Sequence, residues 1–185
     1  ARPYLNQIEV IRNVSLSVPV GKTVLVKEHP MMLGRRTMNF YKNILQIPNV
    51  MLVDFDLSSK SVLSNAELVV IIRGAIGLEA VISKIPVISL GRSMFELLPV
   101  SMFRFCESLY NLPNEIKDSI ENYEYDHDAL IKYLAAVIEG SAPVNLVTDL
   151  LGKKGRYKEN VEEFKFEVHP HLDVLADYMI QRIQQ

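Results

Sequence analysis

Two hydrophobic patterns alternate along residues 6–91 of the chain. Continuous runs of apolar, mostly β-branched residues are typical of strands buried on both faces, and the segments between them carry apolar residues at helical spacing. The strands are predicted at residues 23–27, 50–53, 68–72 and 86–90. The helices are predicted at residues 6–18, 36–45, 58–64 and 75–83.

Strands and helices that alternate at this spacing indicate βαβ units, whose crossovers are nearly always right-handed. We therefore expect an α/β domain with a Rossmann-like, doubly wound parallel sheet. A chain of 185 residues is slightly longer than one typical domain. We predict a single domain with an α/β core at residues 1–125 and a helical C-terminal segment at residues 126–185.

The pattern becomes less regular after Gly91. A short fifth strand is expected at residues 102–105, and a polar loop is expected at residues 152–159. Apolar stripes at helical spacing predict three further helices at residues 114–120, 127–138 and 171–183.

Composition excludes several classes of protein. The chain has 20 Lys and Arg against 22 Asp and Glu, a net charge of -2, and no basic stripe to neutralise a run of phosphates, so a nucleic-acid partner is not expected. The single cysteine, Cys106, cannot form an internal disulfide. No apolar run approaches the roughly 20 residues of a membrane-spanning helix, and no signal peptide is visible. The opening Ala1-Arg2-Pro3 is typical of the cut end of a longer protein.

Polar and glycine residues directly follow two of the predicted strands. Lys27, Glu28 and His29 follow the first strand, and Arg73 and Gly74 follow the third. In an open parallel sheet, ligands bind in the crevice outside the carboxyl ends of the strands. These residues are therefore candidates for a binding site.

The turn from the third strand into the next helix has the chemistry of a phosphate site. Gly74 and Gly77 allow a close approach of the backbone, and free amides at the start of a helix favour an anion. Two glycines at such a turn also occur for packing reasons alone, so both explanations remain open.

Several motifs in this order and spacing resemble the capsule polysaccharide synthesis and export family. They are Lys27-Glu28-His29-Pro30, Phe40-Tyr41, Pro48-Asn49-Val50, Gly74-Ala75-Ile76-Gly77-Leu78-Glu79-Ala80, and Lys84-Ile85-Pro86-Val87-Ile88 with Gly91. The resemblance covers residues 20–91. It implies a bacterial glycosyltransferase of the GT-B fold, a family that includes users of a CMP-activated Kdo sugar. This chain then corresponds to the C-terminal, donor-binding domain, and the N-terminal acceptor-binding domain lies outside the sequence.

The resemblance also assigns roles to single residues. His29 matches the His-Pro element that contacts the phosphate or sugar of the donor, and it is the expected catalytic residue. Glu79 matches the glutamate that holds the ribose hydroxyls in many GT-B enzymes, and Gly74 and Gly77 match the phosphate-side turn. The remaining substrate-binding candidates lie beside these positions, namely Lys27, Glu28, Arg73 and Ala75.

Plain structural explanations stand beside these roles. His29 also fits a residue that ends a strand before Pro30, and Glu79 also fits a solvated residue in the first turn of a helix. The chain departs from the family at Arg73 and Ala75, where the family more often has hydroxyl residues. An arginine there offers a charge-assisted bond to phosphate instead.

The expected partners are a nucleotide-sugar donor (CMP- or UDP-linked), a polysaccharide or glycolipid acceptor, and the missing N-terminal domain. Neither a metal site nor a cofactor is expected. The single cysteine fits a reducing cytosol, so a cytoplasmic protein is expected. A peripheral association of the full-length protein with the inner face of the inner membrane stays open. Two alternatives remain: an enzyme like UDP-N-acetylglucosamine 2-epimerase, and a noncatalytic GT-B-like domain. The isolated domain is expected to bind donor without turning it over.

Overall fold

The computed structural model describes residues 4, 6–29, 32, 34–144 and 170–184. The chain divides into two compact units, residues 1–133 and residues 134–185. Among the described residues, the second unit contains the end of one helix and the C-terminal helix, and the strands lie in the first. The loop predicted at residues 152–159 lies outside the described residues.

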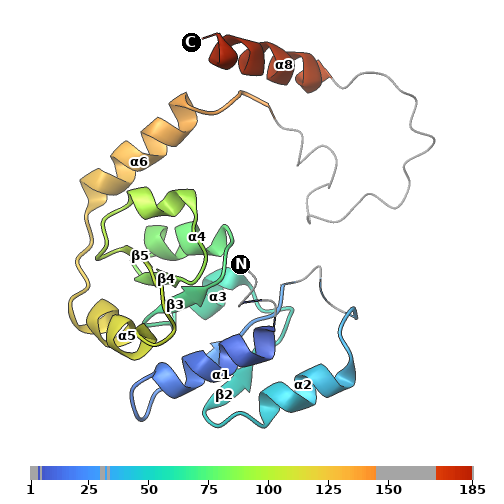
Figure 1. Ribbon diagram of the computed structural model, residues 1–185, viewed down its shortest axis with the longest axis vertical. Helices are drawn as coiled ribbons and strands as arrows, with labels where there is room; N and C mark the ends of the chain where they lie inside the picture. Colours follow the sequence, from blue (N-terminus) through green and yellow to red (C-terminus); the bar gives the residue numbers. More distant parts are fainter. Residues whose placement is uncertain (1–3, 5, 30–31, 33, 145–169, 185) are drawn as a thin grey trace. The chain divides into compact units, whose positions relative to one another are not determined.

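Strands and helices alternate as the hydrophobic pattern predicts (Figure 1). The strands are β1 (Val24–Val26), β2 (Val50–Leu52), β3 (Val69–Ile71), β4 (Val87–Ser89) and β5 (Phe103–Phe105). The helices are α1 (Gln7–Ser17), α2 (Met38–Leu45), α3 (Ser59–Leu63), α4 (Ile76–Ile82), α5 (Leu112–Glu121), α6 (His127–Glu139) and α8 (Pro170–Ile183), with a 3₁₀ helix η3 (Met94–Leu97).

All the paired strands are parallel, which confirms the predicted Rossmann-like α/β class. They form two sheets, one with the order β1-β2 and one with the order β3-β4-β5. Val24 is paired with Val50 in the first sheet. In the second sheet, Val87 of the central strand is paired with Val69 on one side and Phe103 on the other.

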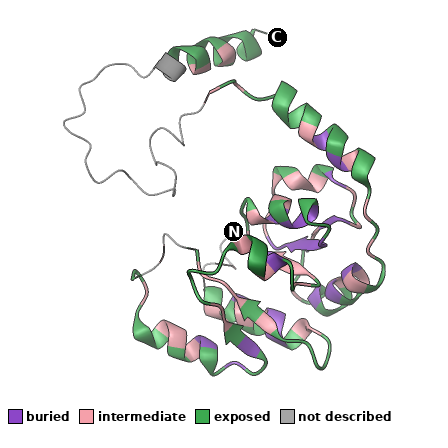
Figure 2. Cartoon of the chain, turned by 180° about the vertical axis from the view of Figure 1, so that it is seen from behind, coloured by how far each residue is buried: buried purple, intermediate pink, exposed green. Residues whose placement is uncertain are grey.

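The central strand β4 is buried on both faces. Val87, Ile88 and Ser89 are at most 1% exposed. On one face, α4 covers the sheet with Ala80 and Val81, both fully buried. Helices α1 and α5 cover the other face, so the three-stranded sheet is doubly wound, and buried residues line its central strand (Figure 2).

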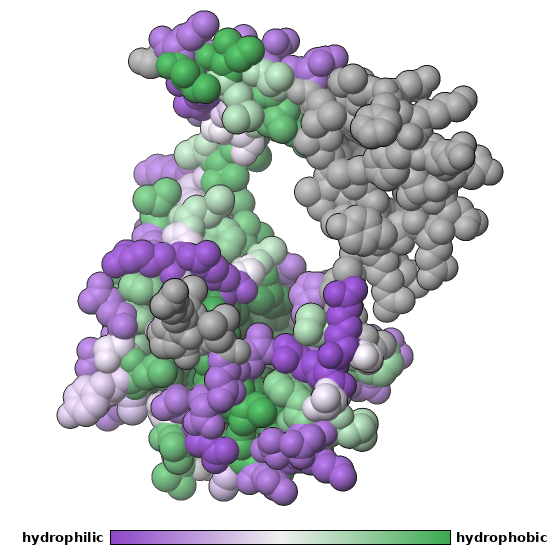
Figure 3. Space-filling model, turned by 45° about the vertical axis from the view of Figure 1, so that its right-hand side comes forward, coloured by the Kyte–Doolittle hydropathy of each residue, from purple (hydrophilic) through white to green (hydrophobic). Residues whose placement is uncertain are grey.

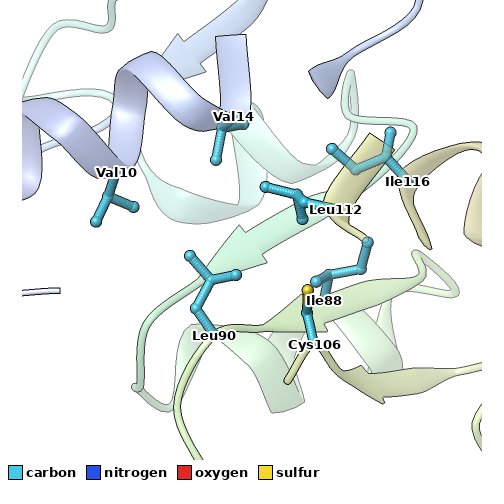
Figure 4. Close-up of a cluster of buried hydrophobic side chains, with 7 residues drawn as sticks. All are labelled: Val10, Val14, Ile88, Leu90, Cys106, Leu112 and Ile116. Atoms are coloured by element: carbon cyan, nitrogen blue, oxygen red, sulfur yellow. The ribbon is translucent and has the colours of Figure 1, made fainter. Parts of the chain in front are cut away.

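The core between the sheet and helices α1 and α5 is one apolar cluster (Figure 4). The helices and strands contribute side chains that point toward one another, and Cys106 lies among them with no exposed surface. Burial raises the pKa of this thiol, with Glu115 raising it further. The buried members are Val10, Val14, Ile88, Leu90, Cys106, Leu112 and Ile116.

The sheet of β1 and β2 has a smaller core on one face only. Ile44, Ile47 and Val50 form that core with partly buried residues of α1 and α2. Leu25 and Met51, which are register partners on the two strands, are 43% and 57% exposed. The outer face of this sheet is therefore partly open.

Two contacts join the sheets at their starting edge. The ammonium group of Lys22, just before β1, lies 2.5 Å from the carboxylate of Glu67, just before β3. Val24 of β1 packs against the same core cluster as Leu68 and Val70 of the other sheet. The starts of β1 and β3 are therefore close together.

The sequence prediction missed the 3₁₀ helix η3, which follows β4. Ser93 and Glu96 form a capping box there: the side chain of Ser93 accepts from the amide of Phe95, and Glu96 accepts from the amide of Ser93 at 2.7 Å. The Ser-x-x-Glu spacing is itself a sequence signature of a helix start. The signal was therefore present in the chain.

The ends of β3 and β4 approach each other closely at Gly91. A Cβ atom added there would lie 2.6 Å from the carbonyl oxygen of Ile72, below any ordinary contact distance. The hydroxyl of Ser89 donates to the carbonyl of Gly91 at 2.6 Å and to that of Ile72 at 3.3 Å. This edge of the sheet depends on a glycine at position 91.

Gly91→Ala is expected to destabilise the domain by about 1–3 kcal/mol, because its methyl group meets backbone that must shift. The measurement is the free energy of unfolding in urea of wild type, Gly91→Ala and Gly77→Ala.

Gly77→Ala is the matched control: its Cβ would meet the end of the Ile71 side chain at 2.7 Å, and that side chain can rotate. Alanine also favours helix over glycine by about 1 kcal/mol, so the control should lose less stability. Equal stability of wild type and Gly91→Ala would contradict the close approach.

Candidate functional site

The carboxyl ends of β1 and β3 form the candidate site. Lys27, Glu28 and His29 follow β1, and Arg73 and Gly74 follow β3. Each of the two predicted segments thus lies at the carboxyl end of a strand with a parallel partner. Their side chains, however, differ in how far they are already engaged by the protein.

Lys27 and Glu28 both have partners within the protein. The ammonium group of Lys27 donates to the carbonyl oxygen of Phe55, beyond the end of β2, at 3.3 Å. One carboxylate oxygen of Glu28 accepts from Nε of Arg36 at 2.8 Å, and the other accepts from the hydroxyl of Tyr41 at 2.5 Å. Both residues therefore hold the exit of β1 in place.

The carboxylate of Glu28 belongs to a network of four residues, here called the Glu28 network: Gln7, Glu28, Arg36 and Tyr41. Arg36 also donates from Nη2 to the side-chain oxygen of Gln7. Its guanidinium carbon lies 4.2 Å from the centre of the Phe40 ring, a cation–π contact. The network joins the exit of β1 to α1 and α2.

The network changes the ionisation of Tyr41. The hydrogen bond to Glu28 raises the pKa of the Tyr41 hydroxyl, with smaller contributions from desolvation and from the negative charge of Glu28; the positive charge of Arg36 lowers it. A hydroxyl that donates to a carboxylate is harder to deprotonate because its anion would face a like charge. Tyr41 thus stays a donor to Glu28 through the neutral pH range.

His29 lies immediately after this network and is exposed. Its carbonyl oxygen accepts from the amide of Met32 at 2.8 Å, so the backbone turns directly after it. Glu28 is directed into the protein and its side chain is 16% exposed. The exposed imidazole of His29 is accessible at the edge of the fold.

Arg73 is the cationic residue of the second segment. It is exposed, and no hydrogen bond or ion pair to it occurs within the described part of the chain. A Cβ on Gly91 would lie 3.2 Å from Cγ of Arg73 and 3.4 Å from its Nε, so the arginine stem lies over that glycine. The position of the Arg73 stem therefore depends on the absence of a side chain at Gly91, as does the approach of Gly91 to Ile72.

Gly74 and Ala75 make the turn into α4. Gly74 has a φ angle of 147°, a conformation that favours glycine. Ala75 is the N-cap residue and supplies no side-chain hydrogen bond to the helix. Neither the amide of Ala75 nor that of Ile76 has a hydrogen-bond acceptor among the described residues. The turn therefore presents amides that an anion can use, on a helix of only seven residues.

Gly77 and Glu79 lie further along α4 and face opposite ways. Gly77 is buried, and a Cβ there would meet Ile71 at 2.7 Å and Phe103 at 3.2 Å, so it allows the helix to lie close to the sheet. This packing role holds with or without a ligand. Glu79 is exposed on the solvent side of α4.

Sequence reasoning gave no site role to several polar residues near these strand ends. Arg36 and Tyr41 act on Glu28 from positions 8 and 13 residues further along the chain, and no local pattern announces such contacts. Arg92 follows β4 and lies 4.5 Å from the centre of the Phe105 ring. It forms ion pairs with Glu96 at 2.9 Å and Glu107 at 3.3 Å.

A shallow hollow lies at the other edge of the fold. It is lined by Pro99 and Ser101, which precede β5, and by residues 124–128. It is therefore separate from the ends of β1 and β3.

Among the described residues, no group of three or more His, Cys, Asp or Glu is placed to hold a metal ion. In the same part of the chain, no helix is long and apolar enough to cross a membrane.

On the face shown in Figure 3, hydrophilic and hydrophobic residues are interspersed over the surface of the first unit. Residues 8–138 match the family described as capsule polysaccharide biosynthesis protein, a span that includes every candidate residue above. Comparisons with curated proteins and with solved structures found no match.

The Glu28 network makes a prediction about titration. The hydroxyl of Tyr41 should ionise above its ordinary pKa of 10.0, and Glu28→Gln should lower that pKa toward the ordinary value by removing the charge. Because the folded pKa is raised, the stability linked to Tyr41 is present below pH 10 and is lost as the pH rises through the folded value.

The measurement is an NMR titration of ¹³C-labelled tyrosine, with Tyr41→Phe to assign the signal. Glu9→Gln is the control, because Glu9 pairs with Arg12 and has no contact with Tyr41. The same Tyr41 midpoint in wild type and Glu28→Gln would show that the hydrogen bond does not persist in solution.

Proposed function

This chain belongs to the capsule polysaccharide biosynthesis protein family, and we propose that it is the donor-binding domain of a glycosyltransferase. The domain binds a nucleotide-activated sugar, CMP- or UDP-linked, for transfer to a polysaccharide or glycolipid acceptor. An N-terminal domain of the same protein completes the active site. The isolated chain then binds donor but does not transfer it.

One observation carries the proposal: His29 and Arg73 follow the carboxyl ends of β1 and β3, two strands with parallel partners whose starts are joined by the pair of Lys22 with Glu67. In open α/β folds, this edge is where ligands bind. His29 is exposed there, and Arg73 has no partner within the described residues. A site at this edge can therefore bind an anionic ligand with the nitrogen donors of two side chains, His29 and Arg73.

Sugar transfer requires that negative charge be stabilised on the leaving phosphate as the glycosidic bond breaks. Arg73 meets this demand with charge-assisted hydrogen bonds, and the amides of Ala75 and Ile76 add uncharged donors. His29 is the proposed catalytic residue and donates from its imidazole to the same phosphate. The scheme uses no metal ion, because Arg73 supplies the positive charge and the imidazole and the two amides supply further donors.

The rest of the donor lies further along the same surface. Glu79 accepts hydrogen bonds from the ribose hydroxyls, and its exposure on α4 supports that role. Gly74 gives the backbone its turn beside the phosphate, and Gly77 fixes the distance between α4 and the sheet. The base that activates the acceptor hydroxyl comes from the other domain.

A noncatalytic domain with the same fold is the second candidate. Ala75 stands at the N-cap of α4 without a side-chain hydrogen bond, and this supports a turn that has lost part of its phosphate chemistry. Binding of nucleotides separates the two candidates, because a domain kept only for assembly has no need of it.

Nucleotide binding is expected to depend on Arg73 and His29. CMP or UDP should raise the melting temperature of the chain, and the nucleosides should raise it much less, since most contacts go to the phosphate. Arg73→Ala should weaken nucleotide binding about tenfold or more, the value of a charged hydrogen bond, and His29→Ala should also weaken it.

Calorimetric titration measures these affinities. Arg12→Ala is a matched control, because Arg12 lies on α1 and pairs only with Glu9 among the described residues. If neither nucleotide shifts the melting temperature at millimolar concentration, the donor-binding proposal fails and the noncatalytic candidate stands.

Glu79→Gln is expected to behave differently from Arg73→Ala. Because its proposed partner is the ribose, the variant should weaken the binding of nucleotide and nucleoside by the same factor. The measurement is the pair of dissociation constants for cytidine and CMP, or for uridine and UDP. A loss confined to the nucleotide would place Glu79 at the phosphate instead.

A further inference from the structure

We infer that Glu28 is a positioning residue that acts through His29, and that Tyr41 and Arg36 share this role. The inference rests on the proposed function, because His29 is assigned there to the donor phosphate. It replaces the expectation that Glu28 itself contacts the substrate.

The contacts of Glu28 are turned into the protein. Each carboxylate oxygen accepts a hydrogen bond, one from Arg36 at 2.8 Å and the other from Tyr41 at 2.5 Å. The side chains of Glu28 and Arg36 are 16% and 20% exposed, so this ion pair is largely withdrawn from solvent. The guanidinium neutralises the carboxylate, which leaves Glu28 poorly suited to bind a ligand but well suited to hold a fixed position.

The fixed position is transmitted to His29 through the backbone. His29 follows Glu28 directly, and its own carbonyl accepts from Met32. On the other side of Glu28, Lys27 is held by the carbonyl of Phe55. His29 is thus carried by a short segment that is anchored by the two side chains preceding it.

Three elements contribute to the anchor. Glu28 comes from the exit of β1, Tyr41 from α2 and Gln7 from α1, and Arg36 joins them with bonds to both Glu28 and Gln7. Helix α1 also packs on the main core through Val10 and Val14. The anchor that precedes His29 therefore depends on the packing of the domain and not on the strand alone.

Tyr41→Phe is the sharpest variant for a test. It removes one hydrogen bond to Glu28, keeps the aromatic ring, and leaves the pair of Glu28 with Arg36 in place. The control is Tyr110→Phe, because Tyr110 is 91% exposed and lies outside the Glu28 network. Glu28→Gln is a second variant that keeps the size of the side chain and removes its charge.

The binding experiment is a double-mutant cycle with CMP and UDP as probes. Tyr41→Phe and Glu28→Gln should each weaken binding of the nucleotide that wild type binds, by up to about tenfold. In the His29→Ala background, the same two changes should have no further effect, because they act through the missing imidazole. Additive losses would overturn the inference by showing that Glu28 contacts the ligand itself, and unchanged affinity in the single variants would overturn it as well.

A second experiment needs no ligand. In protein labelled with ¹³C-histidine, Tyr41→Phe should move the ring signals of His29, and Tyr110→Phe should leave them in place. Unmoved His29 signals in Tyr41→Phe would overturn the positioning role. A different result would overturn the proposed function: wild type binds no nucleotide, although the His29 signals move in Tyr41→Phe. The coupling of Tyr41 to His29 would then stand, but the nucleotide would not be the ligand of His29.

Discussion

The central strand β4 is buried on both faces, between α4 on one side and helices α1 and α5 on the other. A strand in this position must leave no polar group unpaired: its backbone finds parallel neighbours in β3 and β5, and its one polar side chain, Ser89, donates to the carbonyls of Ile72 and Gly91. This burial fixes where β3 ends and α4 begins, and therefore where Arg73 and Gly74 stand. The edge that carries the candidate chemistry is a consequence of the core beneath it.

Glycine serves this edge in three physical ways. Gly74 adopts a backbone conformation that other residues rarely tolerate. Gly91 lets the ends of β3 and β4 approach within a distance that excludes a Cβ atom, and Gly77 lets α4 lie close to Ile71 and Phe103. Gly77 and Gly91 are therefore needed for close packing between elements, and Gly74 is needed for its backbone conformation.

The charged residues at the edge divide into those that hold the protein and those that face outward. Glu28 and Lys27 are committed to internal partners, and Arg92 is paired with two carboxylates. Arg73 has no such partner among the described residues. Internal partners restrict the side chains of Lys27 and Glu28, whereas Arg73 stays exposed.

The sequence by itself determined the element order, the parallel α/β class and the strand ends that carry polar residues, because hydrophobic periodicity and turn residues are local signals. It also held the Ser-x-x-Glu start of η3. Only the tertiary structure decided that the strands form two sheets, that Gly77 packs against Ile71, and that Glu28 is bound by Arg36 and Tyr41. Those contacts join residues far apart in the chain, and a side chain's partner depends on which elements the core brings together.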